Sequence, residues 1–176
     1  MQFCLVETSI GTFGLGWTEA GVSRVALPGA SAADAARLLQ KNGGELAEPW
    51  GRVAEVEEQI VAYTEGEREA FADVALDLSG VPEFNLKCYA DIRTLGWGET
   101  TTYGAIARRL GDVALSRAVG AAMGANPIPL IIPCHRVLAA AGRTGGFSAP
   151  GGVTAKMRML ALERATTPDG QYGFGF

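Results

Sequence analysis

A single cysteine–histidine pair is the most chemically suggestive feature of this sequence. Cys134 is followed directly by His135, which is the only histidine among the 176 residues. A cysteine is a nucleophile only as its thiolate, so it needs a lowered pKa, a nearby base or a helix N-terminus. His135 is a candidate base. Because the side chains of adjacent residues rarely hydrogen-bond to each other, we expect a water molecule to relay the proton.

A base of this kind needs an acid that orients its imidazole. Glu163, in the stretch MRMLALER on a predicted C-terminal helix, is the candidate for that role. The alternative interpretation is a buried structural cysteine beside a histidine that caps a helix. The pair alone leaves both interpretations open.

The composition is that of a globular chain with one or two small domains, with 48% hydrophobic and 19% charged residues. No apolar run approaches the roughly 18 residues that span a bilayer, and the N-terminus lacks a secretory signal pattern. The three cysteines have no C-x-x-C spacing and fit a reducing compartment. With one histidine they match no zinc-ligand pattern. We therefore expect a cytoplasmic protein without metal, cofactor or membrane contact.

Charge is divided unevenly along the chain. Residues 1–83 hold 5 Lys and Arg against 14 Asp and Glu, a net charge of −9. Residues 84–176 hold 10 against 5, a net charge of +5. This asymmetry indicates a basic half that is suited to phosphate groups and an acidic half that is not. The alternative is that the two halves merely attract each other.

The first half predicts a small antiparallel sheet with flanking helices. Short β-rich runs between turn residues indicate three strands, at 3–8, 13–17 and 22–27. Ser31 is a candidate cap for a helix over 32–40. Four apolar residues at helical spacing predict a second helix: Trp50, Val53, Val56 and Ile60. The alternating stretch 73–79 predicts a further strand, and 79–83 is the best candidate linker.

The second half predicts a mainly helical domain. One helix has its apolar face at Phe84, Cys88, Ile92 and Leu95. Thr101 or Thr102 is positioned to cap a helix over 103–110 that stops at Gly111, and Asp112 to cap a helix over 114–124. Two helices around a short glycine-containing turn have the outline of a helix-turn-helix, which many pairs of core helices share.

We therefore predict an α+β chain. Residues 1–83 form an N-terminal structural domain, and residues 84–176 form a C-terminal domain with the helix-turn-helix. Three prolines within 127–133 exclude a central paired strand there. The last stretch, 166–176, has the composition of a loosely held tail.

Longer stretches around Cys134 resemble the O6-alkylguanine-DNA alkyltransferases, the methylated-DNA–protein-cysteine methyltransferases. PCHRV, at 133–137, resembles the active-site motif of that family. The resemblance also includes GETTTYGAIARRLG, SRAVGAAMGANPIPLII, GRTGGFSAPGG and the closing K…ML…E, and it covers nearly all of 84–164 in order. The first half is similar only in architecture. The resemblance implies repair of duplex DNA by base flipping, with one alkyl group moved from guanine O6 to the protein's own cysteine.

The resemblance implies a role for each of five residues. Cys134 is the expected acceptor nucleophile, His135 the base acting through water, and Glu163 the orienting acid. Tyr103 matches a tyrosine that crowds the 3′ phosphate and helps to protonate the leaving guanine. Arg117 matches an arginine that fills the base stack after flipping.

The resemblance also implies a substrate pocket and a helix that contacts DNA. Asn126 matches the asparagine that ties the helix-turn-helix to the active-site loop, and Lys156 a lysine near the pocket. The backbone near Val137 and Ser148 is expected to line that pocket. Expected DNA contacts come from Tyr103, Gly104, Arg117, Ala118 and Ala121. Small residues allow a helix to approach the minor groove, which the family uses.

Each of these residues also has a simpler interpretation. Tyr103 fits an ordinary helix aromatic, Arg117 a solvated charge, and the alanines tight helix packing. Arg136 fits either a structural role or a phosphate contact. Two features depart from the family pattern. Asp112 places an anion in the helix-turn-helix turn, and the loop 145–156, which contains Ser148, is longer than in many members.

The expected partner is double-stranded DNA carrying O6-alkylguanine, bound through the minor groove by a monomer, with O4-alkylthymine as a possible second substrate. One competing class is a damage-sensing DNA binder like the alkyltransferase-like proteins, in which tryptophan replaces the cysteine; the presence of Cys134 argues against it. The other is a Cys-His hydrolase, which would have a histidine distant in sequence from its cysteine. The sequence contains no second histidine.

Overall fold

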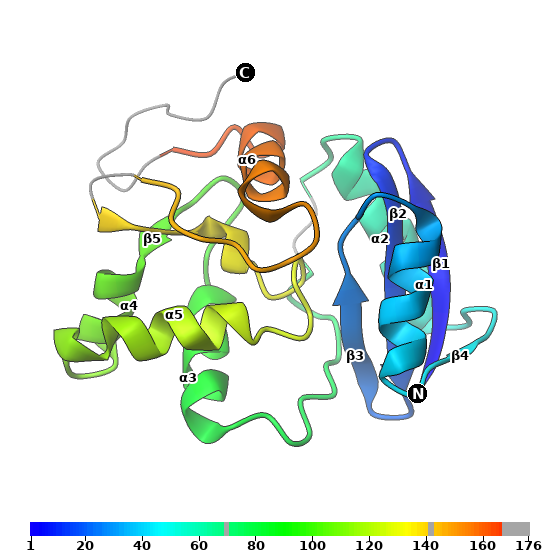
Figure 1. Cartoon of the computed structure of the whole chain (residues 1–176), viewed down its shortest axis with the longest axis horizontal. Helices are drawn as coiled ribbons and strands as arrows, with labels where there is room; N and C mark the ends of the chain where they lie inside the picture. Colours follow the sequence, from blue (N-terminus) through cyan, green and yellow to red (C-terminus); the bar gives the residue numbers. More distant parts are fainter. Residues whose placement is uncertain (69–70, 141–142, 167–176) are drawn as a thin grey trace. The chain divides into compact units, whose positions relative to one another are not determined.

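Figure 1 shows the computed structural model of the chain, which describes residues 1–68, 71–140 and 143–166. The chain forms two compact units. The first unit comprises 1–78, 127–131 and 149–151. The second comprises 79–126, 132–148 and the described residues from 152 onward. A single cut after residue 83 does not separate these units, because two short segments of the second half of the chain pack with the first unit.

The first unit contains the predicted antiparallel meander. Its strands are β1 (Gln2–Thr8), β2 (Gly11–Thr18) and β3 (Gly21–Ala26), with the short β4 (Glu45–Leu46) beside β1. The order is β3-β2-β1-β4, and only the β1–β4 pair is parallel. Two-residue turns join the three long strands, as the turn residues between the β-rich runs predict. The sequence did not predict β4.

Two helices cover the sheet, α1 (Ala32–Lys41) in front and α2 (Arg52–Thr64) behind it in Figure 1. Both confirm predicted helices. A Cβ at Gly14 would lie 2.6 Å from Leu39 of α1, so glycine allows this helix to pack closely on β2. The Ser31 hydroxyl contacts the Asp34 carboxylate at 3.0 Å and makes no capping bond to the backbone. Trp50 precedes α2 and is 73% exposed, so it is not part of the buried helix face as predicted.

The predicted strand at 73–79 is wrong. Only an isolated parallel bridge forms there, between Leu76 and Val22 of β3. Val22 N donates to Ala75 O at 2.9 Å, and Asp77 N donates to Val22 O at 2.8 Å. A Cβ at Gly21 would lie 2.4 Å from Ala75 O, so only glycine allows this approach. The alternation of apolar and polar residues in 73–79 therefore accompanies a single bridge and not a full strand.

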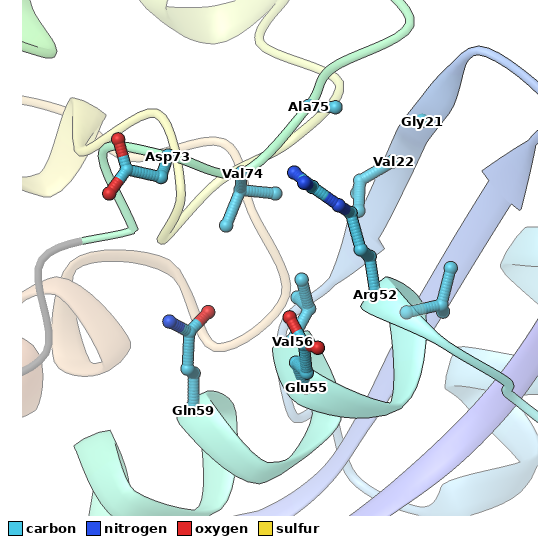
Figure 2. Close-up of a pocket in the computed structure, with 10 residues that line it drawn as sticks. Gly21, Val22, Arg52, Glu55, Val56, Gln59, Asp73, Val74 and Ala75 are labelled. Atoms are coloured by element: carbon cyan, nitrogen blue, oxygen red, sulfur yellow. The ribbon is translucent and has the colours of Figure 1, made fainter.

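A small cleft of about 130 Å³ lies between this segment and α2. Figure 2 shows the side chain of Arg52 extending from α2 toward Ala75. Apolar side chains of Val22, Val53, Val56 and Val74 line the cleft together with the polar side chains of Arg52, Glu55, Gln59 and Asp73. The three charged residues of this lining are exposed.

The second unit is mainly helical. Its helices are α3 (Glu83–Ile92), α4 (Tyr103–Arg109), α5 (Ser116–Gly124) and α6 (Gly152–Leu162), with 3₁₀ turns η1 (Val113–Leu115) and η2 (Cys134–Arg136). Two short parallel strands, β5 (Thr101–Thr102) and β6 (Val137–Leu138), were not predicted. The buried apolar side chains of this unit include Cys88, Ile92, Ile106, Val119 and Leu160. The small sheet and the helices together confirm the α+β class.

The helix-turn-helix outline is confirmed by α4, η1 and α5. Thr102 caps α4, because its hydroxyl accepts a hydrogen bond from Ala105 N at 3.1 Å. Gly111 follows α4 with φ +111°, a conformation that favours glycine. Asp112 accepts from Ala114 N at 2.8 Å and caps η1. Its carboxylate therefore serves the turn itself, and the predicted helix 114–124 is divided into η1 and α5.

Three further predictions concern the connecting segments. Residues 127–133 form no strand, as their prolines predict. Leu95 lies beyond the end of α3 and not on its apolar face. The predicted tail lies, except for its first residue, outside the described residues. Within the described part of the chain, no helix combines the length and the hydropathy that crossing a membrane requires.

Candidate active site

Cys134 begins the turn η2 and is only 5% exposed. Cys134 N donates to Ile132 O at 2.7 Å, and the Asn126 side-chain amide donates to the same oxygen at 2.9 Å. Burial raises the pKa of the Cys134 thiol above its ordinary value, although a hydrogen bond from Asn126 and the charge of Lys156 act in the opposite direction. Cys134 therefore rests as a thiol, and its use as a nucleophile requires a base.

His135 lies fully buried beside this cysteine and contacts the predicted acid. Its Nε2 is 2.7 Å from Oε1 of Glu163. Burial lowers the pKa of His135 below its ordinary value, against the opposing influence of the Glu163 charge, so the imidazole is held neutral. With Nε2 donating to the carboxylate, Nδ1 is the free acceptor of this tautomer. Among the described residues, Nδ1 is buried and has no hydrogen-bond partner.

The carboxylate of Glu163 accepts hydrogen bonds from Arg136, His135 and Gly98. Oε2 accepts from Arg136 Nε at 2.8 Å and from Gly98 N at 3.2 Å. Oε1 accepts from Arg136 Nη2 at 3.1 Å and from His135. Burial alone would raise the pKa of Glu163, but the charges and hydrogen bonds of His135 and Arg136 outweigh it and hold the pKa below its usual range. Glu163 therefore stays ionised and holds the imidazole in one orientation.

Arg136 is thus a structural residue rather than a phosphate contact. It is 7% exposed, and Nη1 donates to Leu95 O at 2.8 Å while the other nitrogens bind Glu163. Sequence reasoning left its role open, because the partner lies 27 positions away. The available signal was its position directly after the Cys-His pair.

Lys156 connects two backbone segments beside the cysteine. Its fully buried Nζ donates to Val137 O at 2.5 Å and to Thr144 O at 2.6 Å. The ammonium group also lies 6.0 Å from the ring centroids of both Tyr103 and Phe147. Burial lowers the pKa of Lys156 to about 8. Lys156 therefore ties β6 to the loop that follows it.

A cavity of about 480 Å³ opens at Cys134. Its lining comprises Tyr103, Gly120, Met123, Gly124, Cys134, Gly146, Phe147 and Ser148. Of the predicted site residues, only Tyr103, Cys134 and Ser148 are in this lining. Sequence reasoning missed the other five, although Phe147 and Gly146 lie within the GGFS stretch that carries the resemblance. Burial raises the pKa of Tyr103, so its phenol is protonated at neutral pH.

Apart from Tyr103, the predicted DNA-contacting residues lie outside the cavity lining. Arg117, Ala118 and Ala121 are exposed on α5, whose opposite face buries Val119 and Ala122. These three side chains therefore form one solvent-facing stripe of the helix. Gly104 is partly exposed at the start of α4, where a Cβ would lie 3.8 Å from Ser116 Oγ.

The remaining cysteines take no part in this arrangement. Cys4 and Cys88 are buried, and burial raises the pKa of Cys4 to about 12 and raises that of Cys88. Over the described ranges, no group of three or more His, Cys, Asp or Glu side chains is placed to hold a metal ion.

Comparisons with known sequences agree with this arrangement. A family model described as "6-O-methylguanine DNA methyltransferase, DNA binding domain" matches residues 83–165. The methylated-DNA–protein-cysteine methyltransferase of Mycolicibacterium paratuberculosis is 44% identical over 111 residues, 63% of this chain and 65% of that protein. Its match thus spans somewhat less than two thirds of that relative. The methyltransferase of the same name from Methanosarcina acetivorans is 34% identical over 167 residues, 93% of this chain and 98% of that protein.

Solved structures extend the likeness to both units. Mycobacterium tuberculosis OGT in complex with DNA has a TM-score of 0.75 and 31% identity, over 93% of this chain and 92% of that chain. The O6-methylguanine-DNA methyltransferase of Pyrococcus kodakaraensis has a TM-score of 0.69 and 27% identity, over 92% and 98%. Together with the Methanosarcina relative, which matches nearly from end to end, these similarities establish that the chain belongs to the methylated-DNA–protein-cysteine methyltransferase family.

Proposed function

We propose that this protein repairs DNA by transferring an alkyl group from O6 of guanine to Cys134, once per chain. One observation carries the proposal: Cys134 lies in the wall of a cavity, with the buried His135–Glu163 pair directly beside it. The pair supplies a neutral imidazole whose Nδ1 is free to accept a proton. A raised thiol pKa makes that base necessary.

The proposed reaction is a displacement at a saturated carbon. Through a water molecule, His135 takes the proton of the Cys134 thiol, and the thiolate sulfur attacks the carbon attached to O6. The carbon–oxygen bond breaks as the carbon–sulfur bond forms. Guanine departs with the electron pair and takes a proton from Tyr103, which lines the same cavity. Tyr103 then regains a proton from solvent and His135 returns the thiol proton to solvent, so the protons balance, and the product on Cys134 is a thioether.

The proposed DNA contact uses the exposed stripe of α5. Small side chains at Ala118 and Ala121 allow the helix to approach a narrow minor groove. Arg117 lies on the same stripe and fills the gap that a flipped guanine leaves in the base stack. We further propose that the protein acts as a monomer in the cytoplasm, with residues 84–176 carrying the chemistry and 1–83 a structural domain.

Two residues, Asn126 and Lys156, support the cavity in this proposal. Asn126 holds the segment before Cys134 and stabilises the thiolate, since its amide hydrogen-bonds the sulfur. Lys156 holds the backbone at Val137 against the loop that leads to Ser148. The resulting wall fixes the position at which an alkylated guanine meets the sulfur.

The test is to incubate the full chain with excess duplex that contains O6-methylguanine and to follow the intact mass. We expect the mass to rise by one methylene group, with a plateau at one group per chain located on Cys134 by peptide mapping. The Cys134→Ser variant should bind the duplex and gain no mass, because a hydroxyl is a much weaker nucleophile than a thiolate. Sustained turnover beyond one equivalent would exclude the proposed chemistry.

The competing interpretation is a protein that flips damaged bases without repairing them. A DNA base-flipping protein of Thermus thermophilus is 44% identical over 111 residues, 62% of this chain and 72% of that protein. The same experiment separates the two functions. Binding of the duplex with an unchanged protein mass would favour the base-flipping function and reject alkyl transfer.

A further inference from the structure

The buried tyrosine Tyr89 connects α3 to the last turn of α5. Tyr89 is 1% exposed, and its hydroxyl donates to Ala122 O at 2.8 Å. The side chain of Asn85, one turn earlier on α3, hydrogen-bonds the same hydroxyl. Burial raises the pKa of Tyr89 to about 12, so the hydroxyl keeps its proton at neutral pH and remains a donor to α5.

The carbonyl group that Tyr89 binds is one of the last four of α5, where a helix runs out of backbone donors. Ala125 N donates to Ala121 O at 3.0 Å and to Ala122 O at 3.2 Å, so Ala122 O shares its backbone donor. Ala122 is itself 1% exposed, so solvent cannot take the place of the tyrosine hydroxyl. Tyr89 therefore fixes the end of this helix.

The same end of α5 leads directly to the residue that holds the nucleophile. Met123 and Gly124 are the last residues of the helix, and both line the cavity that opens at Cys134. Asn126 follows the helix, donates to Ile132 O at 2.9 Å and hydrogen-bonds the Cys134 sulfur. A shift of this turn would therefore move the Asn126 amide away from the sulfur.

We propose that Tyr89 is a positioning residue for alkyl transfer and acts through Asn126. The inference rests on the proposed function and names a further residue that the same site requires. The Tyr89 hydroxyl holds the last turn of α5, and this turn holds the Asn126 amide where it meets the sulfur. Tyr89 is not part of the cavity lining, so it acts without touching the substrate.

The first test is the rate of alkyl transfer from excess duplex that contains O6-methylguanine, followed by the intact mass of the full chain. Tyr89→Phe removes the hydroxyl and keeps the aromatic ring. We expect it to slow transfer about tenfold or more, because a misplacement of about 1 Å can cost about 100-fold. Transfer at the wild-type rate would overturn the inference. Absence of transfer by the wild type itself would instead reject the proposed function.

The second test examines the sulfur directly, without DNA. Burial raises the pKa of the Cys134 thiol, and the hydrogen bond from Asn126 opposes this rise. Loss of that hydrogen bond in Tyr89→Phe should therefore move the pH profile of Cys134 alkylation by iodoacetamide to higher pH. Peptide mapping separates Cys134 from Cys4 and Cys88. A residue that only stabilised the fold would leave this profile in place, so an unchanged profile would contradict the inference.

A double-mutant cycle, measured with the same iodoacetamide reaction, tests whether Tyr89 acts through Asn126. In the Asn126→Ala background, Tyr89→Phe should change the rate by less than about twofold, because the amide that it positions is absent. Rate losses by the same factor in both backgrounds would mean that Tyr89 acts by another route, and the inference would be wrong.

Tyr63→Phe is the matched control. Tyr63 is fully buried in α2, in the first unit, so this variant also loses the hydroxyl of a buried tyrosine. It should leave the transfer rate and the pH profile unchanged. All variants are compared below the temperature at which any of them begins to unfold. Equal effects of Tyr63→Phe and Tyr89→Phe would overturn the inference, because they would report a general loss of stability.

Discussion

Replacing Arg136 by Met should strongly destabilise the protein. The substitution keeps an unbranched apolar stem and removes the three hydrogen bonds of the guanidinium, two to Glu163 and one to Leu95 O. The side chains of both charged partners are almost inaccessible, at 8% and 0% exposure. Glu163 would keep its hydrogen bonds with His135 and Gly98 N but lose both of those from the guanidinium. Removing one partner of a buried ion pair costs about 3–5 kcal/mol.

The loss should be visible in heat and urea, and it should depend on pH. For a chain of this size, about 2–4 °C per kcal/mol gives a fall in Tm of about 6–20 °C. In the wild type, the lowered pKa of Glu163 means that the ionised carboxylate stabilises the fold. This stabilisation is complete when the pH is above 4.5, the ordinary pKa of a glutamate, and it is lost as the pH falls below 4.5. Without Arg136 the carboxyl pKa rises, so less stability remains to be lost in acid.

The assay is calorimetry and urea unfolding at pH 7 and pH 4, with Arg108→Met as the control. Arg108 is exposed, and its replacement should change the free energy of unfolding by less than about 0.5 kcal/mol. A loss below about 1 kcal/mol in Arg136→Met at pH 7 would refute the reasoning. It would mean that the Glu163 carboxylate is satisfied without the guanidinium of Arg136.

Three further outcomes are expected. Lys156→Met leaves two backbone carbonyl oxygens without their buried donor. It should lower the free energy of unfolding by about 2 kcal/mol or more. It should also increase hydrogen exchange in the loop after β6. Burial lowers the pKa of His135, so the neutral imidazole is compatible with the fold and protonation opposes it. The contribution of His135 to the free energy of unfolding should therefore be constant above pH 6.5, the ordinary pKa of histidine, and should fall as the pH falls below 6.5. Urea titrations between pH 7 and pH 5 should show a smaller fall in His135→Gln than in the wild type. Arg117→Ala should slow transfer from duplex DNA much more than transfer from free O6-benzylguanine, since only the duplex requires flipping, and equal losses would place Arg117 elsewhere in the mechanism.

Local signals in the sequence were sufficient where both partners of an interaction lie close together in the chain. Thr102 and the amide that it caps are three positions apart, and Asp112 caps an amide two positions away. The starts of α4 and of η1 were therefore predictable. The hairpins of the first sheet follow the same rule, because each turn lies between the strands that it joins.

Interactions between distant residues were not predictable in this way. The strand expected at 73–79 failed because its only bridge reaches back to Val22, and an alternating pattern contains no information about that partner. Arg136 was visible in its motif, yet its partnership with Glu163 depends on how η2 meets the end of α6. The cavity depends on missing side chains at Gly120, Gly124 and Gly146, and glycines in a sequence more often indicate turns than the width of a pocket.

The path of the chain between the two units has a consequence for synthesis on the ribosome. Val25 N of β3 donates to Pro127 O at 3.0 Å, and residues 127–131 belong to the first unit. The side chains of Ile128, Leu130 and Ile131 in this segment are buried in the complete protein. Domains usually fold in order as they leave the ribosome. Here the N-terminal unit emerges first but lacks 127–131 and 149–151 until most of the second unit has been translated, so Val25 N has no partner at Pro127 O during that interval.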